Sequence, residues 1–183
     1  MRFYTTLGDD GTTDLLGTRV GKDDPRVEAL GALDEATSAI GFARAMSATN
    51  RVRVSFVDVQ RDLYKIMAEL AFTAELRPAA YEFADDRVRW LETETDALAA
   101  DVDLPAEFVL PGESAPGAAV DVARTIVRRA ERQLVALTHA GHKVNPAIIG
   151  YLNRLSSLLF IAARVEDLHA GHAPQRAKER RSH

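Results

Sequence analysis

Between residues 120 and 137, apolar side chains recur at alternating intervals of three and four residues. The positions are Val120, Ala123, Val127, Ala130, Leu134 and Leu137. This spacing follows an α-helical turn of about 3.6 residues, so one face of a helix carries all of these side chains. Such a face is stable only when it packs against other helices, and the pattern therefore predicts a helical bundle.

Four further helices are predicted from similar spacing and from capping residues. Their signals cover residues 24–46, 56–70, 88–98 and 145–163. Prolines and glycines interrupt residues 101–117, and no segment alternates convincingly as a strand. We therefore expect an all-α fold, a five-helix antiparallel bundle with a glycine-rich loop before its first helix.

Composition narrows the class of protein. The chain has 183 residues and 46% of them are apolar, which suits one compact domain. Its formal charge is −4, so the protein has no overall positive field that would bind nucleic acid or an anionic membrane. Cysteine is absent, so disulfides and thiolate chemistry are excluded. The first residues lack the apolar core of a signal peptide. We expect a cytoplasmic protein with one domain over 1–172 and a disordered basic tail over 173–183.

Charged residues lie beside the apolar stripes of two predicted helices. Asp34 follows apolar residues of the first helix at helical spacing, which puts a carboxylate on the inward stripe, where it needs a partner. Arg124 and Arg128 are one turn apart on the fourth helix, and Glu131 follows them. One interpretation is a solvated strip of surface charges. The other pairs Asp34 with one arginine across a helix or subunit interface and leaves the second arginine for a phosphate-bearing ligand.

The N-terminal loop contains Gly-Asp-Asp-Gly-Thr-Thr at residues 8–13, with Arg19 and Lys22 close behind. It does not match the P-loop pattern, because no Gly-Lys-Ser/Thr follows the glycines. A simple turn is one interpretation. Free backbone amides, hydroxyls and nearby cations are also the ingredients of a polyphosphate cradle.

Three blocks in the chain resemble one known family. They are residues 8–35, then Phe-Val-Leu-Pro-Gly at 108–112, then 123–156 with Ala-Arg, Arg-Arg-Ala-Glu-Arg, Val-Asn-Pro and Tyr-Leu-Asn-Arg-Leu-Ser. In this order and spacing they are similar to the PduO-type ATP:cob(I)alamin adenosyltransferases. The resemblance implies a five-helix bundle that forms a homotrimer with active sites between subunits. It also implies transfer of the 5′-deoxyadenosyl group of ATP to Co(I) of cobalamin, which releases triphosphate and forms adenosylcobalamin.

The resemblance also assigns roles to matching residues. Asp34 and Arg124 match an intersubunit ion pair beside the corrinoid, Phe108 matches the aromatic that closes the lower face of cobalt, and Arg128 joins them as a catalytic residue. The expected ATP-binding residues are Thr5, Gly8, Asp9, Gly11, Thr12, Thr13, Lys22, Arg128, Glu131 and Asn153. Residues 1–23 are thus a nucleotide-binding loop, and Mg²⁺ is expected on the ATP phosphates. A flavin-type reductase and an adenosylcobalamin-dependent enzyme are the expected protein partners.

The chain departs from the family pattern at several positions, many of them near the expected nucleotide site. They are Thr6, Leu7, Gly21, Leu30, Thr37, Glu113 and Ser157. Phe108, Asp34 and Arg124, which match the corrinoid site, keep the family residue types. These departures are therefore expected to affect the affinity for ATP most. The alternatives to the enzyme are a corrinoid-binding or carrier protein of the same fold, and a helical oligomer without a ligand.

Overall fold

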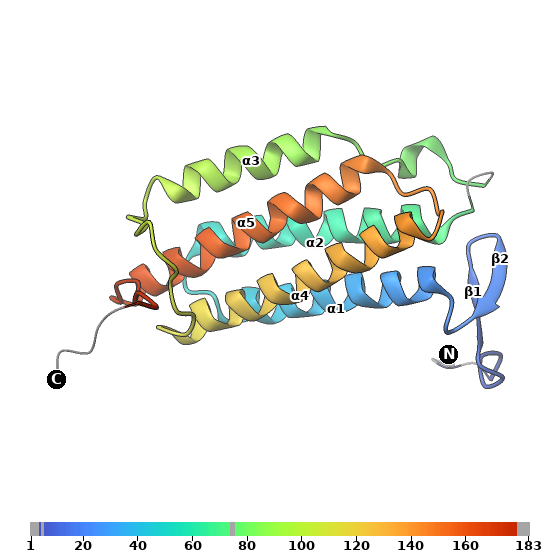
Figure 1. Cartoon of the computed structure of the whole chain (residues 1–183), viewed down its shortest axis with the longest axis horizontal. Helices are drawn as coiled ribbons and strands as arrows, with labels where there is room; N and C mark the ends of the chain where they lie inside the picture. The colour runs from blue at the N-terminus through green and yellow to red at the C-terminus, as the bar shows by residue number, and fades with distance from the viewer. Residues whose placement is uncertain (1–3, 5, 74–75, 179–183) are drawn as a thin grey trace.

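The computed structural model describes residues 4, 6–73 and 76–178. Within that part, five long helices pack side by side, and successive helices run in opposite directions (Figure 1). They are α1 (Pro25–Met46), α2 (Asn50–Ala71), α3 (Asp86–Ala99), α4 (Ala115–His139) and α5 (Pro146–His169), with a short 3₁₀ turn, η1 (Ala79–Tyr81), before α3. The predicted all-α fold with five helices is confirmed.

The helix ends are set by local chemistry that the sequence displays. Side-chain oxygens of Asp24, Ser114 and Asn145 accept hydrogen bonds from backbone amides at the starts of α1, α4 and α5. Gly141 and Gly171 follow the ends of α4 and α5 with φ of 91° and 83°, a region that favours glycine. These bonds satisfy backbone groups that the helices leave unpaired. The predicted starts at residues 24 and 145 are confirmed to within one residue, whereas α2 begins six residues before and α5 ends six residues after the predicted ranges.

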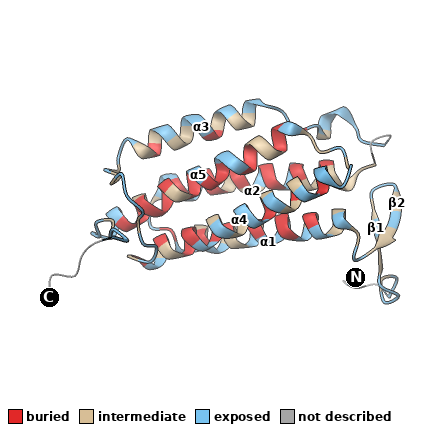
Figure 2. Ribbon diagram, in the orientation of Figure 1, coloured by how far each residue is buried: buried red, intermediate tan, exposed pale blue. Residues whose placement is uncertain are grey.

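Helix α4 packs against both α1 and α5, and many of the buried residues in Figure 2 lie on these three helices. Every residue of the three-four stripe on α4 is buried. Helix α5 is long and apolar enough to cross a membrane by composition alone, but 61% of its most apolar stretch is buried inside the bundle. It is therefore the central core helix.

A β-hairpin stands within the N-terminal loop, next to the start of α1 (Figure 1). Strands β1 (Thr12–Leu15) and β2 (Thr18–Gly21) pair antiparallel. The backbone of Leu16 exchanges hydrogen bonds of 3.0 and 3.1 Å with Ala71 and Thr73, which ties the hairpin to the end of α2. The sequence pattern, in which no segment alternates convincingly, did not predict this hairpin. Strands of four residues are too short for alternation to show, and their pairing depends on the turn between them.

Part of the segment after α5, which was expected to be a disordered tail, contacts the Phe108 segment. Backbone hydrogen bonds of 2.8 Å join Gln175 O to Leu110 N and Ala177 N to Phe108 O. Backbone groups pair whatever their side chains are, so a charged, polar composition did not reveal this contact. Residues 179–183 lie outside the described part of the chain.

Candidate active site

Helices α1 and α4 lie next to each other and carry most of the expected catalytic residues. Arg124, Arg128 and Glu131 follow one another along α4 as predicted. Glu131 Oε1 accepts a hydrogen bond of 3.0 Å from Asn153 Nδ2 of α5, so the structure brings together two of the expected ATP-binding residues. Arg128 is exposed, and its guanidinium is accessible to a ligand.

Asp34 is exposed rather than inward-facing, which corrects the sequence prediction. The buried residues of α1 include Leu33 and Ala36, and one residue corresponds to about 100° around a helix, so Asp34 lies on the flank of the stripe. Among the described residues, Asp34 makes no ion pair within the chain. Its neighbour Glu35 pairs with Arg129 of α4, so this flank lies beside α4. Because Asp34 is exposed, its carboxylate does not need a partner to offset burial. An ion pair between Asp34 and Arg124 of another subunit stays a prediction.

Arg124 is held by a network of buried charges that sequence reasoning missed. Arg124 Nε donates to Asp121 Oδ1 at 2.9 Å, and the other oxygen of Asp121 accepts from Arg164 Nη2 at 2.5 Å. Arg164 Nε donates to Asp167 Oδ2 at 3.0 Å, and Ser114 Oγ donates to Asp167 Oδ1 at 2.7 Å. Arg164 is only 1% exposed. The network thus joins Arg124 to the residue that caps α4.

A signal for this network was present in the sequence. Arg164 and Asp167 interrupt the apolar pattern of the fifth helix, and Asp121 lies next to Val120 of the α4 stripe. Charges at such positions are costly unless they are paired. Spacing alone did not show which charges meet, because Asp121 and Arg164 are 43 residues apart.

Phe108 lies on the segment that connects α3 to α4, and its side chain is 86% exposed. A cavity of about 300 Å³ beside this segment is lined by Gly112, Val122 and Arg124, among others. The structure therefore brings the Phe108 segment and Arg124 to the same end of α4. An apolar surface next to a guanidinium suits a large ligand with both apolar and anionic parts.

The glycine-rich loop and hairpin enclose a cavity of about 390 Å³. Its lining includes Gly8, Asp9, Thr12, Thr13 and Lys22, all of them expected ATP-binding residues. Thr5 lies outside the described residues.

Internal hydrogen bonds hold this loop in shape. Lys22 Nζ donates to Gly8 O at 2.8 Å, and Lys22 N donates to Gly11 O at 2.8 Å. The hydroxyl and amide of Thr12 both donate to Asp10, and these hydrogen bonds hold the pKa of Asp10 below its usual value. The loop therefore presents a fixed backbone and one lysine ammonium, which suits a polyphosphate.

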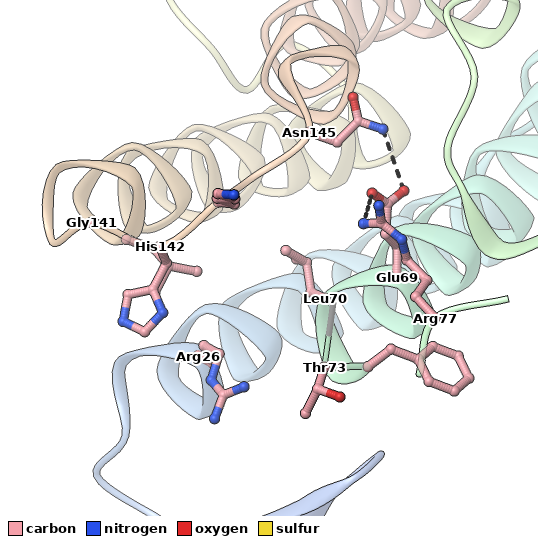
Figure 3. Close-up of a pocket in the computed structure, with 11 residues that line it drawn as sticks. Arg26, Glu69, Leu70, Thr73, Arg77, Gly141, His142 and Asn145 are labelled. Carbon is pink, nitrogen blue, oxygen red and sulfur yellow. Dashed lines mark hydrogen bonds and ion pairs between the residues drawn. The ribbon is translucent and has the colours of Figure 1, made fainter. Parts of the chain in front are cut away.

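Another cavity, of about 420 Å³, lies where the α4–α5 connection approaches the start of α1 and the end of α2. Arg26, Arg77 and His142 line it (Figure 3). The buried carboxylate of Glu69 accepts hydrogen bonds from Arg77 Nη1 at 2.8 Å and from Asn145 Nδ2 at 3.4 Å. Glu69 is therefore occupied in joining α2 to the segments before α3 and α5, and this cavity has no free buried charge in the described structure.

The glycine-rich loop and the Phe108 segment lie at opposite ends of α4, whereas Arg124 and Arg128 lie one turn apart between them. The hairpin stands near the end of α4, whereas the Phe108 segment precedes its first residue (Figure 1). The helix has 25 residues and is therefore about 37 Å long. The cavity beside the Phe108 segment and the cavity of the glycine-rich loop share no lining residue.

Comparisons with known proteins identify the family of this chain. The pattern described as cobalamin adenosyltransferase matches residues 3–166. A corrinoid adenosyltransferase from Bacillus subtilis is 37% identical over 175 residues, covering 93% of this chain and 89% of that protein. The corrinoid adenosyltransferase PduO of Salmonella typhimurium is 38% identical over 175 residues, which cover 94% of this chain but 52% of that protein. The chain therefore spans about half the length of this second relative.

A solved structure is similar over nearly the whole fold. It is a variant of a PduO-type ATP:corrinoid adenosyltransferase from Lactobacillus reuteri, complexed with cobalamin and ATP. The TM-score is 0.89 at 31% identity, and the match covers 97% of this chain and 100% of that chain. With both sequence and fold matched over most of its length, this chain belongs to the cobalamin adenosyltransferase family.

Proposed function

We propose that this chain transfers the 5′-deoxyadenosyl group of ATP to Co(I) of a corrinoid such as cobalamin. The electron pair of Co(I) attacks the 5′ carbon, the carbon–oxygen bond to the phosphate breaks, and triphosphate leaves with that bond's electrons. Because the reduced metal is itself a strong nucleophile, the protein needs to supply only positioning and charge stabilisation. Membership of the family over residues 3–166 supports this activity.

One observation carries the assignment of the corrinoid site. Phe108 is exposed on the segment whose Pro111 and Gly112 line a cavity together with Arg124, so an aromatic ring is available on the connection that approaches this guanidinium. The ring of Phe108 excludes water and other ligands from the lower face of cobalt. A cobalt ion without a lower ligand is easier to reduce from Co(II) to Co(I), and Phe108 thereby makes the nucleophile accessible.

ATP occupies the loop at the other end of the bundle in this proposal. Lys22 and the hydroxyls of Thr12 and Thr13 line the cavity of the glycine-rich loop, where they stabilise the triphosphate. Arg128 and the hydrogen-bonded pair of Glu131 and Asn153 complete the site from α4 and α5. Mg²⁺ binds through the ATP phosphates.

The separation of the glycine-rich loop from the Phe108 segment supports a homotrimer with active sites between subunits. A loop from one subunit then meets α4 of its neighbour, and the exposed Asp34 of one subunit pairs with Arg124 of the next. Asp34→Ala should leave the stability of the isolated subunit unchanged, because Asp34 is exposed, and should shift the trimer toward monomer. Light scattering across a dilution series measures this shift. A wild-type protein that is monomeric at micromolar concentration contradicts the proposal.

The test of the activity is an anaerobic assay with reduced cobalamin and ATP. Formation of the cobalt–carbon bond changes the absorption spectrum, and calorimetry with each ligand measures binding. A protein that binds corrinoid but neither binds ATP nor transfers the adenosyl group would be a carrier protein. The carrier is the second candidate because the chain departs from the family pattern at Thr6 and Leu7. The reaction takes place in the cytoplasm, where a flavin-type reductase supplies the electron and an adenosylcobalamin-dependent enzyme uses the product.

A further inference from the structure

The chain returns to the Phe108 segment after its last helix. Beyond α5, the left-handed Gly171 turns the backbone, and residues 175–177 pair antiparallel with residues 108–110. Leu110 N donates to Gln175 O and Ala177 N donates to Phe108 O, each at 2.8 Å. We refer to residues 175–177 as the C-terminal clasp.

The clasp supplies the backbone anchors of this segment. Between residues 103 and 113, all of which are described, these two bonds are the backbone hydrogen bonds that the structure contains. The side chain of Phe108 cannot hold the segment, because it is 86% exposed and has little packing around it. A segment with so few contacts opens easily unless its backbone is tied down.

The pairing also determines which way the side chains point. Along an extended strand, successive side chains face opposite sides, so Phe108 and Leu110 share one face and Val109 takes the other. Phe108 and Leu110 are exposed, whereas Val109 is half-buried. The two clasp bonds flank Val109 on the chain and therefore fix the alternation that presents the ring of Phe108 outward.

We propose that the C-terminal clasp positions Phe108 against the lower face of the corrinoid, so that removal of the lower ligand of Co(II) depends on residues 175–177. This inference rests on the proposed function. In this proposal the clasp contacts no reacting atom, and it acts only through the backbone of the Phe108 segment.

The test compares two shortened chains. One ends at Lys178 and keeps both clasp bonds, and the other ends at His172 and loses them. Because residues 173–178 are largely exposed, both chains should unfold at the temperature of the full chain. A single variant, Ala177→Pro, removes the amide that donates to Phe108 O and replaces the shorter chain if that one fails to fold.

The main readout is the electron paramagnetic resonance signal of four-coordinate Co(II) with ATP bound. A hydrogen bond of typical strength corresponds to roughly fivefold in an equilibrium constant, so Ala177→Pro should lower the ratio of four- to five-coordinate Co(II) about fivefold, and the chain ending at His172 should lower it further. The rate of adenosyl transfer should fall less when the assay starts from chemically reduced Co(I) than when it starts from Co(II). The affinity for ATP should not change, because the clasp pairs with residues 108–110 and none of these is an expected ATP-binding residue.

The outcomes separate the clasp from the activity. If the chain ending at His172 retains the four-coordinate signal of the chain ending at Lys178 within twofold, the clasp proposal is overturned. If the full chain binds Co(II) corrinoid but transfers nothing from Co(I), the proposed function fails, while the same signal still tests the clasp. A full chain that binds no corrinoid overturns both.

Discussion

Replacing Arg164 with methionine tests the buried charge network directly. Arg164 is 1% exposed and bridges Asp121 and Asp167, which are 4% and 0% exposed. Removing one partner of a buried ion pair costs about 3–5 kcal/mol, because the remaining charge stays buried without compensation. After the change, Asp121 keeps its bond to Arg124 at 2.9 Å and Asp167 keeps its bond to Ser114 at 2.7 Å. We therefore expect the lower end of this range, about 3 kcal/mol.

A matched control exists on the same helix. Arg154 of α5 pairs with Glu92 at 3.0 Å, but both side chains are nearly half exposed, and such pairs contribute about 0–1 kcal/mol. Urea unfolding followed by circular dichroism, at one fixed protein concentration, gives the free energy of unfolding for Arg164→Met and Arg154→Met. For a chain of this size, about 3 kcal/mol corresponds to a fall in Tm of roughly 6–12 °C. An Arg164→Met protein that loses no more than the control would refute the network as a source of stability.

Three further predictions follow from the site and the core. Burial, together with the carboxylate of Asp62 that accepts from its hydroxyl at 2.9 Å, raises the pKa of Tyr151 well above its usual value. The stability that Tyr151 contributes is therefore complete below pH of about 10 and is lost as pH rises further. Tyr151→Phe should lower the free energy of unfolding by about 1.5–3 kcal/mol at pH 8. Above pH 10 this variant should lose less of that free energy than the wild type does, as measured by denaturant unfolding, and equal losses would contradict the prediction. Phe108→Ala should keep the Tm, because the side chain is 86% exposed, yet slow transfer that starts from Co(II); an unchanged rate removes Phe108 from cobalt coordination. Arg128→Ala should weaken ATP binding severely and Thr6→Arg should strengthen it by about 1.5–3 kcal/mol, as measured by calorimetry; if neither changes the affinity, the ATP assignment fails.

Much of the fold follows from short stretches of sequence. The helix over 115–139 was predictable because its apolar spacing matches the helical turn, and its packing partner need only be another apolar stripe. Asp24 and Asn145 marked helix starts because a capping side chain bonds to amides two or three residues away. The blocks around Phe108 and Arg128 were found by resemblance, since order and spacing along the chain are enough to compare them.

What the sequence by itself determined is therefore local: where helices begin and end, and which face of each is apolar. The tertiary structure decided what lies beside what. It placed Asp34 on a flank, because burial depends on which neighbouring helix covers a face and not on spacing within one helix. It joined Asp121 to Arg164 across 43 residues, and it tied Ala177 to Phe108 through backbone groups that every residue type carries. Such contacts leave no local periodicity in the sequence, because they form only after the helices have packed.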